Sequence, residues 1–306
     1  MAKGSWARRL LRAESGGDAA FKAVTGAFAL ALVALFLDLL WVLGHGAWPA
    51  VRAFGIRFLW STDWNPIVGH YGAAPFVVGT LASAFLGLLF AVPVAVGTAV
   101  ALAMLLPRPV SATLGAIVEL LAAVPSIIFG VWGFAVLLPF VHRLSGGRSP
   151  GPSLLAGGLV LAAMVLPIIT VVSRDMIRAV PQSQRDAALA LGATPWEVTW
   201  KVVLPYARPG MLAGVILAFG RAVGETMAVI MVIGNQNVIP HSLFDAAATM
   251  SATIANNFGE TTASEPILRA ALVELGLILL LVSLALNLLA KGIVKRLGRR
   301  LGVDRL

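Results

Sequence analysis

Two charged side chains, Arg221 and Glu225, stand four residues apart inside the apolar stretch "AFGRAVGETMAVIMVIG". Residues four apart on a helix lie on the same face, so this arginine and glutamate are expected to be able to pair. A guanidinium group is planar, permanently charged and able to donate to two oxygens at once, which makes it a natural partner of phosphate. Two interpretations follow from the residues alone: an ion pair that fixes helix packing, and a site for an anion.

The two residues have different uses in an anion site. Arg221 supplies the positive charge. Glu225 can neutralise that charge while the site is empty, and it can accept a hydrogen bond from a protonated oxyanion. Sulfate offers no such proton at neutral pH, so the pair favours phosphate over sulfate as its anion.

The chain that carries this pair has the composition of an integral membrane protein. Of the 306 residues, 59% are hydrophobic and 12% are charged, and the mean hydropathy is +0.91. A soluble protein of this length carries about twice that charged fraction, because polar residues must cover its surface. The absence of cysteine excludes disulfides and thiolate metal sites, and the four histidines are scattered without metal-ligand spacing.

Apolar runs of about 20 residues or more predict an all-α fold with six transmembrane helices. The runs cover residues 24–43, 75–106, 113–140, 154–177, 207–235 and 268–290. Pro93, Pro125 and Pro167 lie inside them and predict kinks. The expected organisation is an N-terminal segment at 1–23, a membrane domain at 24–290 that includes a polar loop at 178–206, and a basic tail at 291–306.

Six spans put both termini on one side of the membrane, and the basic residues indicate which side. Lys3, Arg8, Arg9 and Arg12 precede the first run, and further Lys and Arg residues gather in the polar loop and the tail. The positive-inside rule therefore predicts that both termini and the polar loop are cytoplasmic. The net charge of +9 is thus a topology signal rather than a nucleic-acid footprint. The first run is too long for a cleaved signal peptide and is expected to be a retained anchor.

Ionisable residues inside a membrane span cost about 2.5–3.5 kcal/mol each and are candidates for function. Besides the pair, they are Asp38, Glu119 and Glu274. Asp38 and Glu119 lie close enough to the span ends to reach water, whereas for Glu274 a functional and a structural role are both open. Arg221 follows the cytoplasmic start of run five by ~14 residues, or ~21 Å of helix, which predicts a position near mid-bilayer.

The polar loop contains two helix signals around one glycine. Gly192 can supply the left-handed stop of a first short helix. Thr194, Pro195 and Glu197 then form a Thr-Pro-x-Glu capping box that starts a second helix, which Pro205 is expected to end. The apolar side chains of this loop are expected to pack inward; they are Ala188, Leu191, Trp196 and Trp200. On this pattern alone, the loop could simply be a surface hairpin that joins spans four and five.

The spacing of the loop resembles the "EAA" loop of ABC-importer permeases, with aspartate in place of glutamate and valine in place of isoleucine. The matching positions are Asp186, Ala187, Ala188, Gly192, Val202, Leu204 and Pro205. The resemblance implies a coupling helix that docks in a groove of a cytoplasmic ATPase subunit. The residues expected to carry this coupling are Asp186, Ala187, Ala188, Gly192, Ala193, Thr194, Leu204 and Pro205.

No phosphate-binding loop of the Gly-x-x-x-x-Gly-Lys-Ser/Thr type occurs in the sequence. The chain therefore cannot bind ATP in that manner, so no enzyme activity and no cofactor of its own are expected. The ATP and its magnesium ion are expected to be bound by a separate ATPase chain.

Four further stretches extend the resemblance over about residues 21–290. They are "FLWSTDWNP", "AAPFVVGTL", "LLAAVPSIIFGVWGF" and "GRAVGETMAVIMVIGN". Together with the loop, they resemble the permease subunit of the high-affinity phosphate ABC importer, in its PstC-type rather than its PstA-type form. The resemblance implies that Arg221 and Glu225 act in phosphate translocation. It also implies a second, PstA-type permease, an ATPase homodimer, an extracytoplasmic phosphate-binding protein and a place in the bacterial inner membrane.

Several alternatives stay open on the sequence. A permease for another oxyanion, such as sulfate, molybdate or phosphonate, would carry the same loop. An intramembrane enzyme would need paired aspartates, a Ser–Lys dyad or a His-Glu-x-x-His helix, and the sequence shows none of these. Phosphate sensing is a further role that the resemblance allows for the whole complex, although no separate signalling domain is visible. The two long loops on the outer side, 44–74 and 236–267, can hold short helices and meet a partner, or only cap the bundle.

Overall fold

The structure, a computed structural model, describes residues 16–147, 149–259, 261 and 265–300. These described residues form helices and no named strand, and two isolated β-bridges join Asn65 to His70 and Gly234 to Ala247. The all-α prediction is confirmed. The chain divides into two units, Met1–Gly46 and Ala47–Leu306, and each is described by itself.

The first unit contains most of helix α2 (Gly16–Phe54). Residues Ala20–Phe54 of this helix are long and apolar enough to cross a membrane, and the predicted first span lies within them. The basic residues predicted to precede the span, Lys3, Arg8, Arg9 and Arg12, lie outside the described residues.

Within the described residues, six helices in all are long and apolar enough to span a membrane, which confirms the predicted number. Five lie in the second unit: α4 with its π-helical end η1 (Ala74–Val100, Ala101–Leu105), α6 to α7 (Ser126–Leu144), α8 (Leu154–Arg178), α10 to α11 (Pro195–Val223) and α14 (Pro266–Arg300). Shorter helices lie between them: α3 (Arg57–Trp60), α5 (Arg108–Ala122), α9 (Gln182–Ala190), α12 (Met227–Ile230) and α13 (Met250–Phe258).

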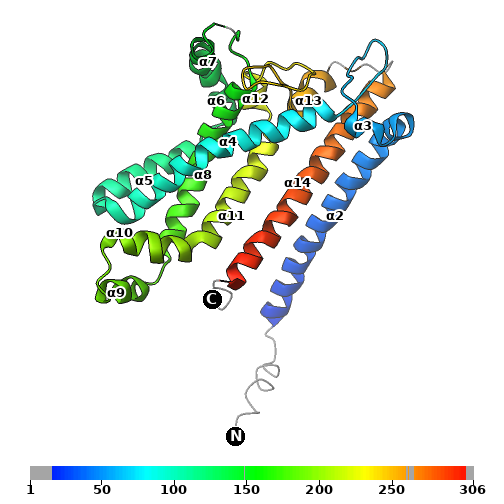
Figure 1. The fold of residues 1–306 in the computed structure, drawn as a ribbon. Helices are drawn as coiled ribbons and strands as arrows, with labels where there is room; N and C mark the ends of the chain where they lie inside the picture. Colours follow the sequence, from blue (N-terminus) through cyan, green and yellow to red (C-terminus); the bar gives the residue numbers. More distant parts are fainter. Residues whose placement is uncertain (1–15, 148, 260, 262–264, 301–306) are drawn as a thin grey trace. The chain divides into compact units, whose positions relative to one another are not determined.

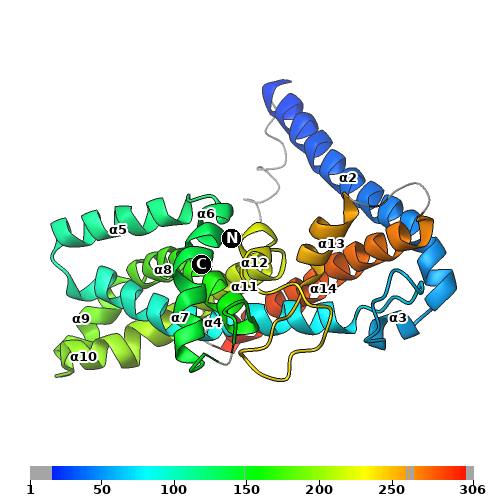
Figure 2. The same ribbon diagram turned by 90° about the horizontal axis from the view of Figure 1, so that it is seen from above.

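Helix α8 is the centre of the second unit, where it packs against α4 and α11 (Figure 1 and Figure 2). Glycines allow α4 and α8 to approach closely. A Cβ atom on Gly158 would lie 2.7 Å from the side chain of Leu86, and one on Gly87 would lie 2.9 Å from the Cβ atom of Leu161. Small residues at crossings are typical of membrane helix pairs, since association there depends on close packing.

The third predicted span, 113–140, is wrong as a single helix. The chain forms α5 as far as Ala122, leaves the helical conformation at Val124 and Pro125, and starts α6 at Ser126. Proline has no N–H to continue a helix and disfavours the helical conformation in the residue before it. Pro93 and Pro167, by contrast, lie inside the continuous helices α4 and α8. The break makes α5 a separate helix that packs against α8.

The fifth predicted span, 207–235, is wrong at both ends. The helix begins at Pro195, passes through the π-helical segment η3 (Val198–Val203) and ends at Val223. Pro205 therefore does not end the second loop helix. It lies just after the π-helical segment, at the start of the α-helical part, where a missing N–H is tolerated. After Gly224 the chain forms only the short helix α12.

The two outer loops contain the short helices that their lengths allow, α3 in the first and α13 in the second. The tryptophan of the "STDWNP" stretch is buried: the ring centroid of Trp64 lies 5.1 Å from that of Tyr71 and 4.9 Å from that of Phe76. These aromatic rings pack in one cluster with Met250 of α13 and Leu272 of α14. Arg148 and the tail residues 301–306 lie outside the described residues.

Candidate functional site

Arg221 lies in the last turn of α11, and its side chain is exposed. The helix packs on the core through the buried residues Ala218, Ala222 and Val223. Among the described residues, no hydrogen bond or ion pair engages the Arg221 guanidinium. An arginine in an apolar helix without an acidic partner keeps all of its five N–H donors and its full charge available.

The predicted pairing of Glu225 with Arg221 is wrong in this structure. Because α11 ends at Val223, Glu225 lies beyond the helix and no longer one turn above Arg221. The Glu225 carboxylate instead accepts a hydrogen bond from the backbone N–H of Ala228 at 3.2 Å, at the start of α12. The backbone carbonyl of Glu225 accepts from the Ser251 hydroxyl at 2.7 Å.

The helix break separates the two charges that the sequence suggested would cancel. The Glu225 carboxylate is held at the start of α12, and the Arg221 charge is not compensated by any described acidic group. Of the two interpretations from the sequence, the ion pair that fixes packing is therefore absent among the described residues. What the geometry leaves is an exposed arginine without an ion-pair partner among the described residues.

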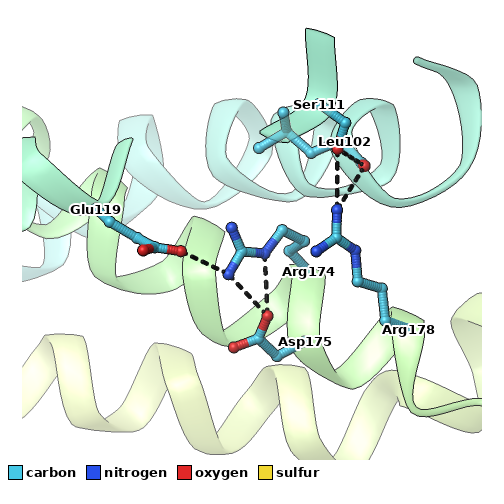
Figure 3. Close-up of polar contacts among 6 residues, drawn as sticks. All are labelled: Leu102, Ser111, Glu119, Arg174, Asp175 and Arg178. Atoms are coloured by element: carbon cyan, nitrogen blue, oxygen red, sulfur yellow. Dashed lines mark hydrogen bonds and ion pairs between the residues drawn. The ribbon is translucent and has the colours of Figure 1, made fainter. Parts of the chain in front are cut away.

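Glu119 is the second ionisable residue whose contacts differ from the prediction. It lies on α5, and its carboxylate accepts from Nη2 of Arg174 at 2.9 Å (Figure 3). Arg174 is buried on α8 and also contacts Asp175, with 2.9 Å between Nη2 and Oδ1. A Cβ atom on Gly115 would lie 2.9 Å from Nη1 of Arg174, so the glycine leaves room for the guanidinium against α5. The buried arginine therefore joins α5 to α8.

A second arginine one turn further along α8 holds the end of the preceding span. Nη2 of Arg178 donates to the carbonyl of Leu102 at 3.2 Å and to the hydroxyl of Ser111 at 2.9 Å (Figure 3). The Ser111 hydroxyl in turn donates to the same carbonyl at 2.6 Å. Leu102 lies in the π-helical end of the second span, where carbonyls lack an intrahelical partner. From the sequence, these arginines counted only as topology signals. Their spacing of four residues, which puts both on one face of α8, was the available indication that they act together.

The other two ionisable candidates are less informative. Asp38 lies on α2 in the first unit and is exposed. Glu274 is buried in α14, and its Oε2 atom has no hydrogen-bond partner among the described residues. Its neighbours in the sequence, Leu272 and Leu275, belong to the apolar cluster of Trp64, Tyr71 and Phe76.

The polar loop forms the predicted pair of short helices. Helix α9 ends at Ala190, and Gly192 follows with a φ of +86°, which glycine adopts without strain. The capping box is confirmed: the Thr194 hydroxyl accepts from the backbone N–H of Glu197 at 3.3 Å, and the Glu197 carboxylate accepts from that of Thr194 at 3.0 Å. Arg185 fastens the loop to α8, since its Nη2 donates to the Ile177 carbonyl at 2.7 Å.

The predicted coupling residues divide into an exposed and a partly buried set. Asp186, Ala187, Gly192 and Thr194 are exposed, and Asp186 accepts a hydrogen bond from Gln182. Ala188, Ala193, Leu204 and Pro205 are partly buried, and the first three pack on a small cluster beneath the loop.

The prediction that the large apolar side chains of the loop pack inward is wrong for three of four. Leu191 is 90% exposed, Trp196 62% and Trp200 52%; Ala188 alone packs inward. The two indole rings contact one another edge to face, with centroids 5.3 Å apart. The cluster beneath the loop is already filled by smaller residues such as Val198 and Val203, so the rings remain outside it. Exposed large apolar groups on a polar loop are typical of a contact surface.

The two long loops, 44–74 and 236–267, and the α7–α8 connection surround a cavity of about 1100 Å³. Thr62 of the "STDWNP" stretch lines it together with residues such as Ser145, Pro152, His241 and Phe244. No group of three or more His, Cys, Asp or Glu side chains that could hold a metal ion occurs in the described part of the chain. The side chains that line the cavity are partly polar and partly apolar. Such a mixture is typical of surfaces that contact another protein.

The chain matches a known family over most of its length. Residues 91–303 match the family model described as "Binding-protein-dependent transport system inner membrane component". The match covers more than two thirds of the chain, from the middle of α4 to the end of α14, and so includes the polar loop and Arg221.

Relatives from several bacteria resemble the chain over nearly its whole length. The chain is 38% identical over 300 residues to a "Phosphate transport system permease protein PstC" of Pasteurella multocida, which covers 92% of this chain and 93% of that one. It is 41% identical over 303 residues to the protein of the same name from Mesorhizobium japonicum, with 93% and 92% covered. It is 39% identical over 243 residues to a "Probable ABC transporter permease protein YqgH" of Bacillus subtilis, with 79% and 78% covered.

Solved structures share the fold at low sequence identity. A chain of a bacterial ABC transporter that imports the acidic polysaccharide alginate, solved with an alginate-bound periplasmic protein, matches with a TM-score of 0.60 at 15% identity. It covers 92% of this chain and 96% of that one. A chain of the MetNI methionine ABC transporter in an inward-facing conformation matches with a TM-score of 0.57 at 20% identity, covering 72% and 94%.

Proposed function

Because this chain belongs to the family of binding-protein-dependent transport system inner membrane components, we propose that it is the permease subunit of an ATP-driven importer that moves inorganic phosphate into the cytoplasm. The observation that carries the assignment is the identity of 36–41% to phosphate transport permeases, which extends over about nine tenths of the chain. The chain is a multi-pass membrane protein and a transport component.

Arg221 is proposed to be the main phosphate contact within the membrane. Its guanidinium is exposed in this chain and has no described acidic partner, so an oxyanion can take the place of the missing counter-charge. Glu225 is proposed to lie beside the same path. Its carboxylate, held at the start of α12, can accept a hydrogen bond from a protonated phosphate oxygen, a contact that fully ionised sulfate does not offer.

One continuous helix supports a mechanical link between the loop and this site. Residues Pro195–Val223 run without interruption from the capping box at Thr194 to the turn that carries Arg221. Its 29 residues form α10, η3 and α11 in direct succession, with no loop between them. A displacement of the loop at one end therefore moves the Arg221 end, provided that the helix moves as a rigid body.

The partner at the loop is proposed to be a separate ATPase subunit, present as a homodimer that binds ATP and magnesium. The exposed side chains of Leu191, Trp196 and Trp200 provide the apolar contact area that such a docking needs, and the exposed positions at Ala187 and Gly192 leave room for a close approach. A second, PstA-type permease would complete the translocation path. An extracytoplasmic phosphate-binding protein would meet the outer loops around the cavity of about 1100 Å³. In this arrangement both termini face the cytoplasm of a bacterial inner membrane.

Uptake of labelled phosphate tests the proposal. Cells without their own phosphate importers would express this chain with its genomic neighbours, and unlabelled sulfate or molybdate would be added as a competitor. We expect energy-dependent phosphate uptake that an excess of either competitor leaves unchanged. Uptake that is absent, or that sulfate or molybdate erases, would contradict phosphate as the substrate while leaving the family membership intact.

A further inference from the structure

Helix α14 carries a row of polar side chains that none of the sites above uses. Ser283, Asn287 and Lys291 follow one another at intervals of four residues in the otherwise apolar stretch "LGLILLLVSLALNLLAKGIV". Four residues turn an α-helix by about 400° and advance it by ~6 Å, so the three side chains lie within about 80° on one face. We call these three residues the α14 polar stripe. Nδ2 of Asn287 donates along it to the carbonyl of Ser283 at 2.9 Å.

The α14 polar stripe meets α11 next to Arg221. A Cβ atom on Gly220 would lie 3.6 Å from both Nδ2 and Oδ1 of Asn287. Gly220 immediately precedes Arg221, and α11 and α14 contact each other along this region. Asn287 therefore contacts α11 one residue before Arg221. Both side chains are exposed in this chain.

The stripe lies at the edge of the packed face of α14. Leu286, about 100° to one side of Asn287, packs on the apolar core formed with α8 and α11. Leu288, about 100° to the other side, is 60% exposed. The stripe thus runs between the core of the chain and the surface that faces lipid or another subunit, which is where two halves of a shared path would meet.

The chemistry of the stripe suits an anion that moves toward the cytoplasm. An amide offers two N–H donors, of which the described contacts use one at Asn287. The Lys291 ammonium is a compact charge that binds phosphate without a fixed geometry. A polar amide exposed to lipid would be costly, whereas an amide in a path of water and ions is solvated. Conduction needs several weak sites rather than one tight site, so that the ion can leave.

We propose that the α14 polar stripe lines the cytoplasmic part of the phosphate path, with Asn287 sharing the oxyanion held at Arg221 and Lys291 drawing it toward the cytoplasm. This inference rests on the proposed function of Arg221. The competing explanation is that Asn287 only meets a helix of the second permease and that Lys291 only anchors the cytoplasmic end of the span.

Coupled measurements of phosphate uptake and ATP hydrolysis by the complete complex test the proposal. We expect Asn287→Leu and Lys291→Gln each to lower phosphate uptake at least tenfold while the rate of ATP hydrolysis stays within twofold of the wild type. The matched control is Leu288→Asn, which moves the amide to the neighbouring face and is expected to leave both rates within twofold. Uptake within twofold of the wild type in both Asn287→Leu and Lys291→Gln would overturn the proposal.

Accessibility to a thiol reagent gives a second readout that does not depend on turnover. The chain contains no cysteine, so single substitutions report one position each once the partner chains are freed of reactive cysteine. We expect Asn287→Cys and Lys291→Cys to react with a small, negatively charged thiol reagent and phosphate to slow that reaction. Leu288→Cys is expected not to react. Failure of Asn287→Cys to react, or a reaction that phosphate does not slow, counts against the stripe.

The two proposals fail in different ways. If the wild-type complex takes up no phosphate, the proposed function itself fails. If the wild type takes up phosphate and Arg221→Ala does not, while Asn287→Leu and Lys291→Gln keep normal uptake, the path is correct at Arg221 and the inference about α14 alone is wrong.

Discussion

At the residue scale, Arg221 and Arg174 show how the same side chain takes two different roles. Arg174 is buried and neutralised by Glu119 and Asp175, so its charge is used within the chain. Arg221 is exposed and has no described acidic partner. The difference follows from the helix break at Gly224, which takes Glu225 off the face that carries Arg221. We therefore expect substitution of Arg221 to affect transport and substitution of Arg174 to affect stability.

Substitution of Arg221 tests the first half of this contrast. Arg221→Ala is expected to lower phosphate uptake by at least tenfold while the complex still assembles, because a hydrogen bond to a charged group contributes about 1.5–3 kcal/mol. Arg221→Lys keeps the charge but loses the planar fork, so an intermediate loss is expected. The measurement is labelled uptake with co-purification of the partner chains as the check on assembly.

The matched control for Arg221 lies on the same helix. Arg208 is also exposed on α11, near its N-terminal end. Arg208→Ala removes the same charge from the same helix without touching the proposed site, and it is expected to leave uptake near the wild-type rate. Near-normal uptake in Arg221→Ala would contradict a role of this residue in translocation.

At the element scale, the two arginines of α8 fasten three elements together. Arg174 holds α5, and Arg178 holds the π-helical end of α4 through the Leu102 carbonyl and Ser111 (Figure 3). Both lie in the last two turns of α8, directly before the polar loop that starts with α9. The loop is therefore attached to a base that already joins three helical elements.

Removal of the two carboxylates that neutralise Arg174 tests this fastening. Glu119→Gln alone is expected to cost about 1 kcal/mol or less, because Asp175 still neutralises the guanidinium and half-exposed pairs contribute little. Asp175→Asn alone is expected to behave alike. The double variant leaves a buried charge unpaired, so its cost should exceed the sum of the single costs, toward the ~3–5 kcal/mol of a broken buried pair.

The measurement is thermal unfolding of the purified complex in detergent, with each variant beside the wild type. A double variant whose melting temperature falls by no more than the sum of the two single shifts would show that the carboxylates act independently. Glu197→Gln, which breaks an exposed contact with Lys201 on the loop, serves as a control for the loss of a surface charge.

What sequence patterns could predict at this scale depended on whether the signal was local. The capping box at Thr194 was predictable because its hydrogen bonds join Thr194 and Glu197, which are only three residues apart. The six spans were predictable because length and hydrophobicity decide them. The break at Val124, the continuation through Pro205 and the end of α11 at Val223 were not predictable in this way. The hydrophobicity of an apolar run does not distinguish a continuous helix from a broken one. A π-helical segment next to a proline likewise does not change the hydrophobic pattern.

The site shows the same limit. Arg221 was predictable as a lone charge in an apolar run, whereas the separation of Glu225 from it depended on the helix break. The pairing of Arg174 with Glu119 joins residues 55 positions apart, so no local pattern could reveal it. The exposure of Trp196 and Trp200 depended on the cluster beneath the loop being already filled by smaller side chains.

Gly192 offers a substitution that separates backbone strain from a block to docking. A Cβ atom on Gly192 would meet no other described heavy atom within 4 Å, so the first atom of a side chain has space there, although the φ of +86° strains any residue other than glycine. Gly192→Trp is expected to lower co-purification of the ATPase and stimulated ATP hydrolysis at least tenfold, because bulk at the turn blocks docking. Gly192→Asn is the control, since asparagine accepts the φ of +86° at modest cost and adds little bulk.

Two outcomes would separate strain from docking at Gly192. If Gly192→Asn and Gly192→Trp lose ATPase binding alike, the backbone strain of a non-glycine residue explains the loss, and the docking role of the turn is unsupported. Normal yield of the ATPase together with normal hydrolysis in Gly192→Trp would refute docking at this turn.

At the scale of the whole molecule, the order of the spans fixes which sites share a side of the membrane. The polar loop lies at the start of the span Pro195–Val223, and the outer-loop cavity lies beyond its other end. A span must carry its two ends to opposite faces, so the coupling surface and the cavity cannot meet the same solution. The positive-inside rule assigns the cytoplasm to the loop. If that orientation were reversed, the ATPase would have to dock outside the cell, where ATP is not available to it.

Single cysteines on the two sides test this orientation directly, because the chain has no cysteine of its own. Ala190 at the end of α9 and Asn237 beside the outer cavity are both exposed and are not used by the proposed translocation path. A membrane-impermeant thiol reagent added to intact cells is expected to label Asn237→Cys and to leave Ala190→Cys unlabelled until the membrane is opened. The reverse pattern would place the coupling surface outside and contradict the importer mechanism. Labelling of both positions in intact cells would mean that the span between them does not cross the membrane, and the predicted topology would then fail as a whole.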